Sequence, residues 1–418
     1  MIVREWVRPL GPGLVTGAAD DDPSGIATYS QVGAHFGYGM LWTMVFSFPL
    51  MAAIQQISGR VGRVTGRGIA ANIARHYSPE LLSVIVALLL IANITNLGAD
   101  IGAMGAALHL LIGGPVLVYV VLFGLLSTAL QIAVPYTTYA IYLKSLTLTL
   151  FAYVATVFVV HIPWEQAIRA ALVPSIAFKT DYFTGLIAVL GTTLSPYLFF
   201  WQASQEVDEV ESRPRAQPLK RDPRQGPAHL HRIKLDTYVG MAFSNLVGFF
   251  IILTTAATLH AHGESDIQTT TQAAQALEPL AGRFALLLFA AGIVGTGLLA
   301  VPVLAGSAAY GLGEALGWAV GLERTLLEAK RFYGVLGAAT LIGASLNFTR
   351  LNPIKALFWT AVINGVVAVP VMVVIMLMTA NRRVMGTFTL PLSLKIGGWA
   401  ATAAMAAATA GMFVQMSR

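Results

Sequence analysis

The chain has 418 residues, of which 56% are hydrophobic and only 11% carry a charge. Soluble proteins carry charge on about 25% of their residues, so this composition excludes a soluble enzyme or binding domain and predicts an all-α protein embedded in lipid. The complete absence of cysteine excludes disulfides and thiolate metal ligands. Any ion site must therefore use oxygen, nitrogen or thioether donors.

Apolar runs of about 20 residues, the length that crosses about 30 Å of hydrocarbon, fill nearly all of the chain between residues 11 and 414. No signal-peptide cleavage site precedes the first run, so we expect it to remain in the mature protein. The sequence predicts eleven spans, at 11–33, 40–58, 81–112, 116–135, 140–161, 183–205, 238–259, 284–312, 332–348, 354–379 and 391–414.

The formal charge of +6 follows membrane topology and requires no nucleic-acid partner. Most of the 26 Lys and Arg residues fall in cytoplasmic segments if the N-terminus is cytoplasmic, which predicts a multi-pass protein of a bacterial-type inner (plasma) membrane. A charged, Pro-rich cytoplasmic linker is expected at 206–236. It would join a first repeat (11–161) to a second repeat (183–379), and an extra helix (391–414) would follow.

The first span, within GLVTGAADDDPSGIATYSQ, contains three consecutive acidic residues: Asp20, Asp21 and Asp22. A carboxylate at bilayer depth costs several kcal/mol unless it faces water or a partner, so these residues indicate a functional site. Pro23 removes a backbone donor and Gly25 permits unwinding, so we expect the helix to break here and to free carbonyl groups for a cation. An external loop between two short helices is the alternative, but the flanking apolar lengths fit one broken span better.

The first span of the second half carries Gly191 and Pro196 near its middle. Pro196 alone would also fit an ordinary kink. Interrupted helices in matching positions of two halves, however, are typical of inverted-repeat transporters that bind substrate at the midplane of the bilayer. The pair of breaks therefore predicts a transporter.

Several other polar residues lie inside predicted spans. Asn93, Asn96 and Asp100 share one helical face, which either lines a pathway or forms interhelical hydrogen bonds. Gln202 continues one face of the sixth span, as part of an exit path or of a solvated helix end. Asn364 either reaches a central cavity or bonds a neighbouring helix.

At this point the chain resembles the Nramp family of divalent-metal transporters over nearly its whole length. The strings that carry the resemblance are GPGLVTGAADDDPSG, LWTMVFSFPLMAAIQQISGRVGRVTGRGIAANIARHY, TNLGADIG, LGTTLSPYLFFWQAS and NRRVMG. The resemblance implies a leucine-transporter fold with two inverted five-helix repeats plus an eleventh helix. It also implies that a divalent metal is bound as substrate between the unwound parts of the first and sixth helices, with no other cofactor.

The family's motifs differ here at two ligand positions. Its first-helix motif Asp-Pro-Gly-Asn begins at Asp22, but Gly25 stands at the Asn. Its sixth-helix motif Ala-x-x-Met-Pro-His begins at Thr192, with Ser195 at the Met and Tyr197 at the His. Loss of the thioether removes the softest donor and favours hard cations, so an atypical magnesium-transporting branch of the family fits these changes.

The resemblance also bears on proton coupling. The family's proton-linked Asp and Glu align with Asn96 and Ala99, and Tyr197 stands at its histidine, so we expect weak coupling or none. Ala368 aligns with the tenth-span Gln that faces the metal in the family. The charges of the first break are expected to attract the cation electrostatically. The expected metal site comprises Asp22, Thr192, Ser195, Asp21 and Asp20, and the expected pathway comprises Asn96, Asp100, Gln202 and Asn364.

Other functions are less consistent with these residues. An ion-coupled amino-acid transporter of the same fold would bind a substrate carboxylate at the first break, where three carboxylates would repel it. Intramembrane aspartyl proteases and metal-dependent prenyltransferases require paired Asp motifs that this sequence lacks, so no enzyme is expected. A channel would show ion flux that does not saturate with concentration.

Overall fold

The structure, a computed structural model, describes residues 12–134, 147–212, 216–349 and 352–417, and all regular structure in these ranges is helical. The α-helices are α2 Pro12–Asp20, α3 Pro23–Phe36, α4 Leu41–Thr65, α5 Ile69–His76, α6 Pro79–Ile112, α7 Val116–Ala133, α9 Phe151–Val157, α10 Trp164–Leu172, α11 Thr180–Thr193, α12 Pro196–Glu211, α13 Gly226–Thr258, α14 Thr270–Gln275, α15 Glu278–Ala281, α16 Ala285–Ala315, α17 Lys330–Ser345, α18 Pro353–Ala380, α19 Arg382–Met385 and α20 Leu392–Met416. Short 3-10 helices are η1 Gly37–Met40, η2 Thr147–Leu150, η3 Pro223–Gln225, η4 His260–His262, η5 Gly282–Phe284 and η6 Leu346–Phe348.

Within the described ranges, eight helical segments are long and apolar enough to cross a membrane. This number is smaller than the eleven predicted spans for three reasons. The 3-10 helix η1 joins α3 to α4, so that most of the first two spans forms one run, Pro23–Thr65. Helix α17 has only 16 residues. The predicted span 140–161 lies partly outside the described residues.

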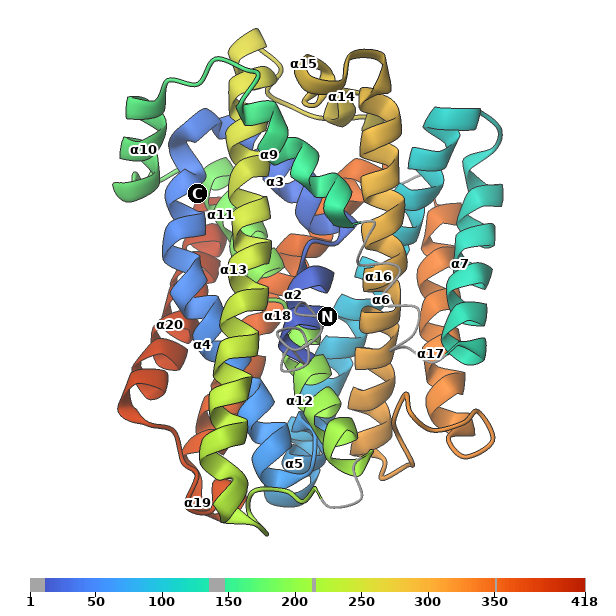
Figure 1. The fold of residues 1–418 in the computed structure, drawn as a ribbon, viewed down its shortest axis with the longest axis vertical. Helices are drawn as coiled ribbons and strands as arrows, with labels where there is room; N and C mark the ends of the chain where they lie inside the picture. The colour runs from blue at the N-terminus through green and yellow to red at the C-terminus, as the bar shows by residue number, and fades with distance from the viewer. Residues whose placement is uncertain (1–11, 135–146, 213–215, 350–351, 418) are drawn as a thin grey trace, which may run out of the picture.

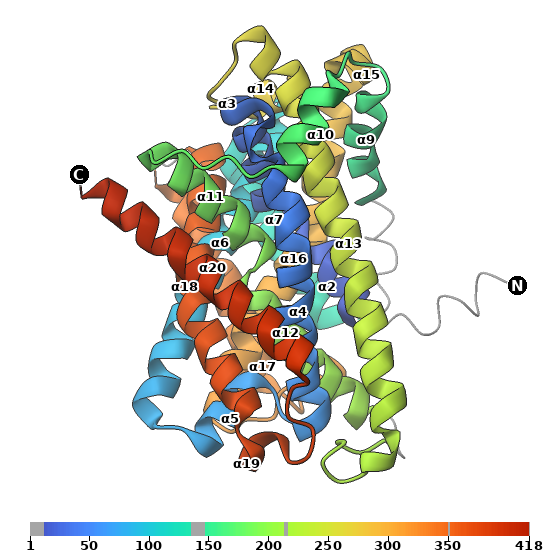
Figure 2. The ribbon, with the colours of Figure 1, turned by 90° about the vertical axis from the view of Figure 1, so that its left-hand side faces the viewer.

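Both predicted helix breaks are confirmed. Helix α2 ends at Asp20 and α3 begins at Pro23, whereas α11 ends at Thr193 and α12 begins at Pro196. Each second half-helix starts with proline because the first helical position needs no backbone donor. The broken helices lie at the centre of the bundle, with α7 and α17 along one edge and α20 along the opposite edge (Figure 1). A view from the side shows α20 crossing the outer face obliquely (Figure 2).

Helix α2 is docked closely onto α13. The Asp236 carboxylate accepts hydrogen bonds from the backbone amides of Gly13, at 2.7 Å, and Leu14, at 3.1 Å. These amides lie at the N-terminal end of α2, where they have no acceptor within the helix. One turn further along α2, a methyl group added to Gly17 would lie 2.2 Å from the Gly240 carbonyl oxygen. The two helix backbones are therefore in direct contact, and glycine is required there.

The segment between the two halves lies along the ends of other helices. Helices α12 and α13 occupy both ends of the predicted linker 206–236, so the described non-helical chain is shorter than that range. Leu219 is fully buried and donates its amide to the Arg63 carbonyl at 3.1 Å. Lys220 donates its ammonium group to the Arg383 carbonyl at 2.7 Å. The segment thus connects α4 to the chain after α18.

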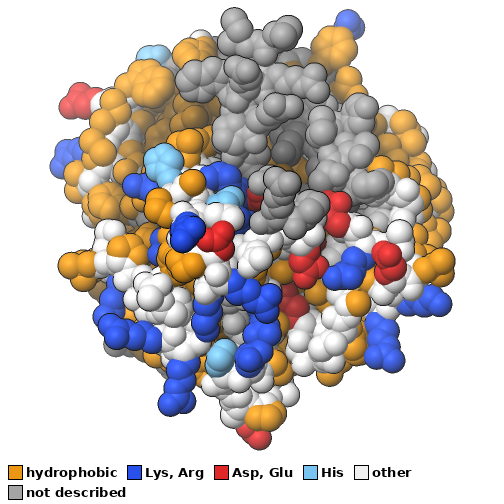
Figure 3. All heavy atoms as spheres, turned by 60° about the horizontal axis from the view of Figure 1, so that its bottom comes forward, with side chains coloured by type: hydrophobic (Ala, Val, Ile, Leu, Met, Phe, Trp, Pro, Cys, Tyr) orange, Lys and Arg blue, Asp and Glu red, His pale blue; other side chains and the backbone are white. Residues whose placement is uncertain are grey.

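Basic side chains gather over this end of the molecule (Figure 3). Partial burial, together with the nearby charges of Arg75, Lys220 and Arg67, lowers the pKa of His76. Like charges disfavour a second positive charge in this way. This end of the bundle is therefore electropositive outside the membrane-spanning helices.

Candidate metal site

Asp22 lies at the first break and is the N-cap of α3. Its Oδ1 accepts a hydrogen bond from the Gly25 amide at 2.6 Å. Its Oδ2 accepts one from the side-chain amide of Asn96 at 2.9 Å and a longer one, at 3.4 Å, from the Tyr197 hydroxyl. With an exposed fraction of 2%, the carboxylate is closed off from solvent. Three donors from three helices fix its orientation.

Asp20 and Asp21 point to a different partner. Both accept from the hydroxyl group of Ser244 on α13, at 2.5 Å for Asp20 Oδ2 and 3.1 Å for Asp21 Oδ1. In the described part of the chain, no three Asp, Glu, His or Cys side chains are grouped so that they could hold one ion. The consecutive acids thus divide into Asp22 on one side and the pair Asp20 and Asp21 on the other.

The second break brings Thr192 and Ser195 to the same region. The Ser195 hydroxyl donates to the carbonyl oxygens of Gly191 and Thr192, at 2.8 Å each. Helix α11 ends here, so these carbonyls lack a full set of helical partners. A carbonyl and a hydroxyl oxygen this close together suit one hard cation.

Gly25 connects the two breaks. A methyl group added to Gly25 would lie 3.2 Å from the Asp20 carbonyl oxygen, 3.4 Å from Thr192 Oγ1 and 3.5 Å from Asp22 Oδ1. Three oxygens, from α2, from the first break and from α11, therefore surround the position where a larger residue would project its side chain. The two breaks are therefore packed against each other at Gly25, with oxygens of both on its side-chain side.

The predicted polar face of the third span, now α6, is directed inward. Asn96 bonds Asp22, and the fully buried Asp100 is close enough to feel the charge of Asp22, although neither of its carboxylate oxygens has a hydrogen-bond partner among the described residues. Asn93 instead donates to the Leu304 carbonyl on α16 at 3.0 Å. Two of the three residues thus reach the candidate site, and Asn93 makes the interhelical bond that was the alternative.

The other two predicted pathway residues, Gln202 and Asn364, form no hydrogen bond with Asp22. Gln202 is fully buried and donates to the Thr237 hydroxyl on α13 at 2.9 Å, so it joins two helices. Asn364 on α18 is 2% exposed, and its side-chain oxygen has no hydrogen-bond partner among the described residues. Both side chains are buried in this conformation.

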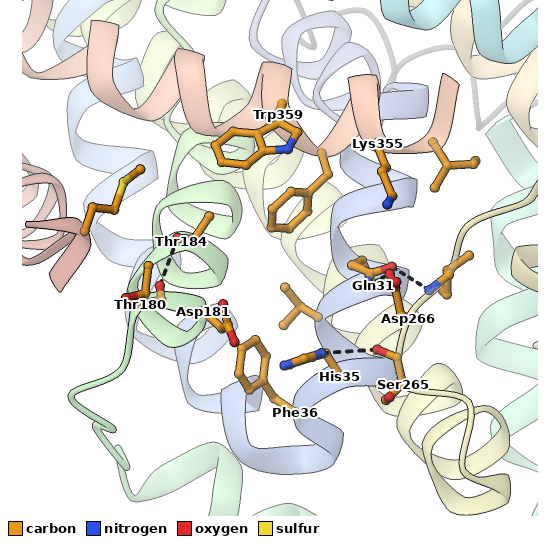
Figure 4. Close-up of a pocket in the computed structure, with 15 residues that line it drawn as sticks. Gln31, His35, Phe36, Thr180, Asp181, Thr184, Ser265, Asp266, Lys355 and Trp359 are labelled. Carbon is orange, nitrogen blue, oxygen red and sulfur yellow. Dashed lines mark hydrogen bonds between the residues drawn. The ribbon is translucent and has the colours of Figure 1, made fainter. Parts of the chain in front are cut away.

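A pocket of about 550 Å³ lies near the end of α3 that is farther from Asp22. Figure 4 shows side chains of α3, α11 and α18 around it, together with Ser265 and Asp266 from the chain after α13. Gln31 donates to Asp266 at 3.2 Å, and the His35 ring lies 3.2 Å from the Ser265 carbonyl. The pocket carries charges of both signs because Lys355 also lines it.

Comparison with known proteins identifies the family. Residues 13–415 match the model of the Nramp family, described as natural resistance-associated macrophage protein-like. The chain belongs to the Nramp family. This membership makes it a transporter rather than an enzyme, as the sequence predicts.

Curated relatives in the Nramp family are divergent. The chain is 27% identical over 303 residues to the divalent metal cation transporter MntH of Pectobacterium carotovorum subsp. carotovorum, covering 70% of this chain and 69% of that protein. It is 24% identical over 418 residues to the MntH of Granulibacter bethesdensis, covering 96% of this chain and 87% of that protein.

Solved structures support the fold. A crystal structure of the Eremococcus coleocola manganese transporter matches with a TM-score of 0.74 at 16% identity, over 99% of this chain and 88% of that chain. The structure of MhsT in complex with L-phenylalanine matches with a TM-score of 0.63 at 13% identity, over 96% of this chain and 98% of that chain. The leucine-transporter fold of this Nramp protein is therefore confirmed.

Sequence reasoning did not identify Ser244, Tyr29 or Asp236, although each contacts the first broken helix or its acidic residues. Ser and Tyr inside an apolar helix are common and carry no distinguishing pattern. Asp236 lies in the predicted linker, where an acidic residue needs no explanation. The one feature of the sequence that could have identified Asp236 is its position two residues before the predicted span 238–259.

Proposed function

We propose that this protein transports hard divalent cations of the Mg²⁺ and Mn²⁺ class by alternating access. The ion would bind between the two helix breaks, to the Asp22 carboxylate, the Thr192 carbonyl and the Ser195 hydroxyl. The single observation that carries the proposal is that the two breaks meet at Gly25, where Asp22 of the first break and Thr192 of the second both lie within 3.5 Å of the position of an added methyl group. Carboxylate, carbonyl and hydroxyl oxygens are the donors that hard cations prefer.

The choice of ion follows from the donors that this chain presents. Mg²⁺ loses its water reluctantly and keeps several water molecules when it binds to proteins. Gly25 contributes no side-chain donor beside Asp22, and Ser195 contributes a neutral oxygen. A partly hydrated ion fits such a site better than an ion that needs a soft thioether donor. The charges of Asp20 and Asp21 add electrostatic attraction.

The proposed topology places the electropositive end of the bundle in the cytoplasm of a bacterial-type inner membrane. The grouping of Arg67, Arg75 and Lys220 at that end supports this orientation because cytoplasmic loops carry an excess of basic residues. The chain contains no cysteine, so a single cysteine can be introduced without background. Lys220→Cys should be labelled by an impermeant maleimide only in inverted vesicles, and Ser175→Cys only in right-side-out cells.

The transport test uses purified protein in liposomes that contain dyes for Mg²⁺, Mn²⁺ and Ca²⁺. We expect saturable uptake of Mn²⁺ that millimolar Mg²⁺ reduces by competition. Uptake that rises linearly with ion concentration would indicate a channel. The alternative is an amino-acid transporter of the same fold, although Asp22 would repel the carboxylate of an amino-acid substrate. Uptake of an amino acid instead of a metal would support that alternative.

A further inference from the structure

Asp20 and Asp21 form a buried acidic pair outside the Asp22 site. Each is only 1% exposed, and the Ser244 hydroxyl lies between Asp20 Oδ2 and Asp21 Oδ1. The remaining oxygens, Asp20 Oδ1 and Asp21 Oδ2, have no hydrogen-bond partner among the described residues. A buried polar atom without a partner costs about 1–3 kcal/mol, and more when it is charged. The pair therefore has unused capacity for a ligand.

The ring of Tyr29 packs against α13 one helical turn from Ser244. Its hydroxyl is fully buried and has no hydrogen-bond partner within the described ranges. A methyl group added to Gly248 of α13 would lie 2.9 Å from Tyr29 Cζ, and Gly248 is one helical turn from Ser244. Among the charged groups that act on the Tyr29 phenol, Asp20 and Asp21 are the strongest. The phenol is thus an independent, unsatisfied oxygen beside the pair.

The charge of the pair is not compensated by nearby basic residues. The charged groups that act on the pair are acidic: Asp22 acts on Asp20, and Asp20 and Asp22 act on Asp21. Two carboxylates at bilayer depth cost several kcal/mol each unless a cation or another partner balances them. A bound divalent cation would supply both missing charges.

We propose that Asp20, Asp21, Ser244 and Tyr29 form a second cation-binding site, which takes a hard divalent cation of the Mg²⁺ class. The proposal rests on the proposed function for the class of ion and adds a second position for it. The four proposed donors are all hard oxygens, which favours this class. The Met44 thioether lies beside the Tyr29 ring, 3.0 Å from the same methyl position on Gly248. An octahedral ion with bonds of about 2.1 Å separates adjacent ligand oxygens by roughly 3 Å. The distances from Ser244 Oγ to the two carboxylates, 2.5 and 3.1 Å, bracket that value.

The second site is separate from the first because its ligands face another helix. Asp22 is held by Gly25, Asn96 and Tyr197, whereas the acidic pair is held by α13. An ion at the second site would connect the C-terminal end of α2 to α13. The N-terminal end of α2 is already attached to α13 through Asp236.

The test counts bound Mn²⁺ per chain, by equilibrium dialysis of the purified full-length protein followed by electron paramagnetic resonance. Wild type should bind two ions. Asp22→Asn should bind one, and the double variant Asp20→Asn with Asp21→Asn should also bind one. Tyr29→Phe keeps the packing of the ring and removes only the hydroxyl. It should raise the dissociation constant of one of the two Mn²⁺ ions by roughly 10-fold and leave that of the other unchanged.

The outcomes separate this proposal from the proposed function. A single ion in wild type that disappears in Asp22→Asn and persists in the double variant would overturn the second site alone. Two ions that persist in Asp22→Asn, with one lost in the double variant, would support the second site and overturn the proposed function. Unchanged binding in both the double variant and Tyr29→Phe would overturn the second site. Size-exclusion profiles and helical circular dichroism would verify that each variant folds.

Discussion

The side-chain amide of Asn96 donates a 2.9 Å hydrogen bond to Asp22 Oδ2, which joins α6 to the first helix break. The opposite carboxylate oxygen accepts from the Gly25 amide. Asp22 therefore serves both as the cap of α3 and as the negative group that faces the second break. A carboxylate held in this way needs little rearrangement to bind a cation.

Two substitutions at Asp22 should separate its charge from its structural role. Asparagine caps helices about as well as aspartate, whereas alanine loses the cap at a cost of about 0.5–2 kcal/mol. We expect Asp22→Asn and Asp22→Ala both to reduce metal uptake by more than about 100-fold, since loss of a ligand exceeds the effect of its supporting partners. Only Asp22→Ala should also lower the melting temperature. Uptake near the wild-type rate in Asp22→Asn would remove the proposed site.

Asn96→Ala should raise the KM for metal uptake about 10-fold, because residues that orient a metal ligand typically contribute this much. Asn93→Ala is the matched control. Asn93 lies one turn away on the same helix but bonds the Leu304 carbonyl, so its loss should leave KM unchanged. Equal effects of the two variants on KM would mean that Asn96 acts only through helix packing.

Transport should proceed without proton movement. Tyr197 occupies the position of the family's histidine, and a phenol keeps its proton at neutral pH. Its hydroxyl lies 3.2 Å from the Ala19 carbonyl and 3.4 Å from Asp22 Oδ2, so it acts as a hydrogen-bond donor at the site. A pH dye inside the liposomes should show no acidification during Mn²⁺ uptake. Acidification that depends on the metal would contradict this prediction.

Changes at the second break should alter the choice of ion. Ser195→Met introduces a soft donor beside the Thr192 carbonyl, so Cd²⁺ and Mn²⁺ should compete better and Mg²⁺ worse than in wild type. Competition assays with the three ions measure the shift, which we expect to reach roughly 10-fold or about 1.4 kcal/mol. If micromolar Cd²⁺ blocks wild-type uptake while millimolar Mg²⁺ has no effect, the site contains a soft donor in addition to the oxygens of Asp22, Thr192 and Ser195.

Gly17→Ala should destabilise the protein, because the added methyl group would lie 2.2 Å from the Gly240 carbonyl oxygen. Overpacking of this kind costs about 1–3 kcal/mol. Gly334→Ala is the control: it is also helical, and no atom lies within 4 Å of the added methyl group. The control should be neutral or more stable by up to about 1 kcal/mol. Thermal unfolding in detergent measures both, and equal melting temperatures would show that α2 can shift without loss.

The two breaks could be predicted from the sequence because their causes are local. Pro23 and Pro196 cannot donate a backbone hydrogen bond, and acidic residues inside an apolar run indicate a site wherever they occur. The inward direction of Asn96 and Asp100 was also predictable from helical periodicity. The number of long apolar helices differs from the number of predicted spans, because η1 joins α3 to α4 and α17 is short.

The direction of each acidic side chain was decided by the tertiary structure alone. Consecutive residues at a break are not constrained by helical periodicity, so their side chains turn to whichever donors the neighbouring helices present. Ser244, more than 220 positions further along the chain, donates to the carboxylates of Asp20 and Asp21. Asn96 donates to the carboxylate of Asp22. Composition and local spacing determined that this protein lies in a membrane and where its helices break. The packing of distant helices determined which oxygens converge, because such contacts depend on chain topology rather than on local sequence.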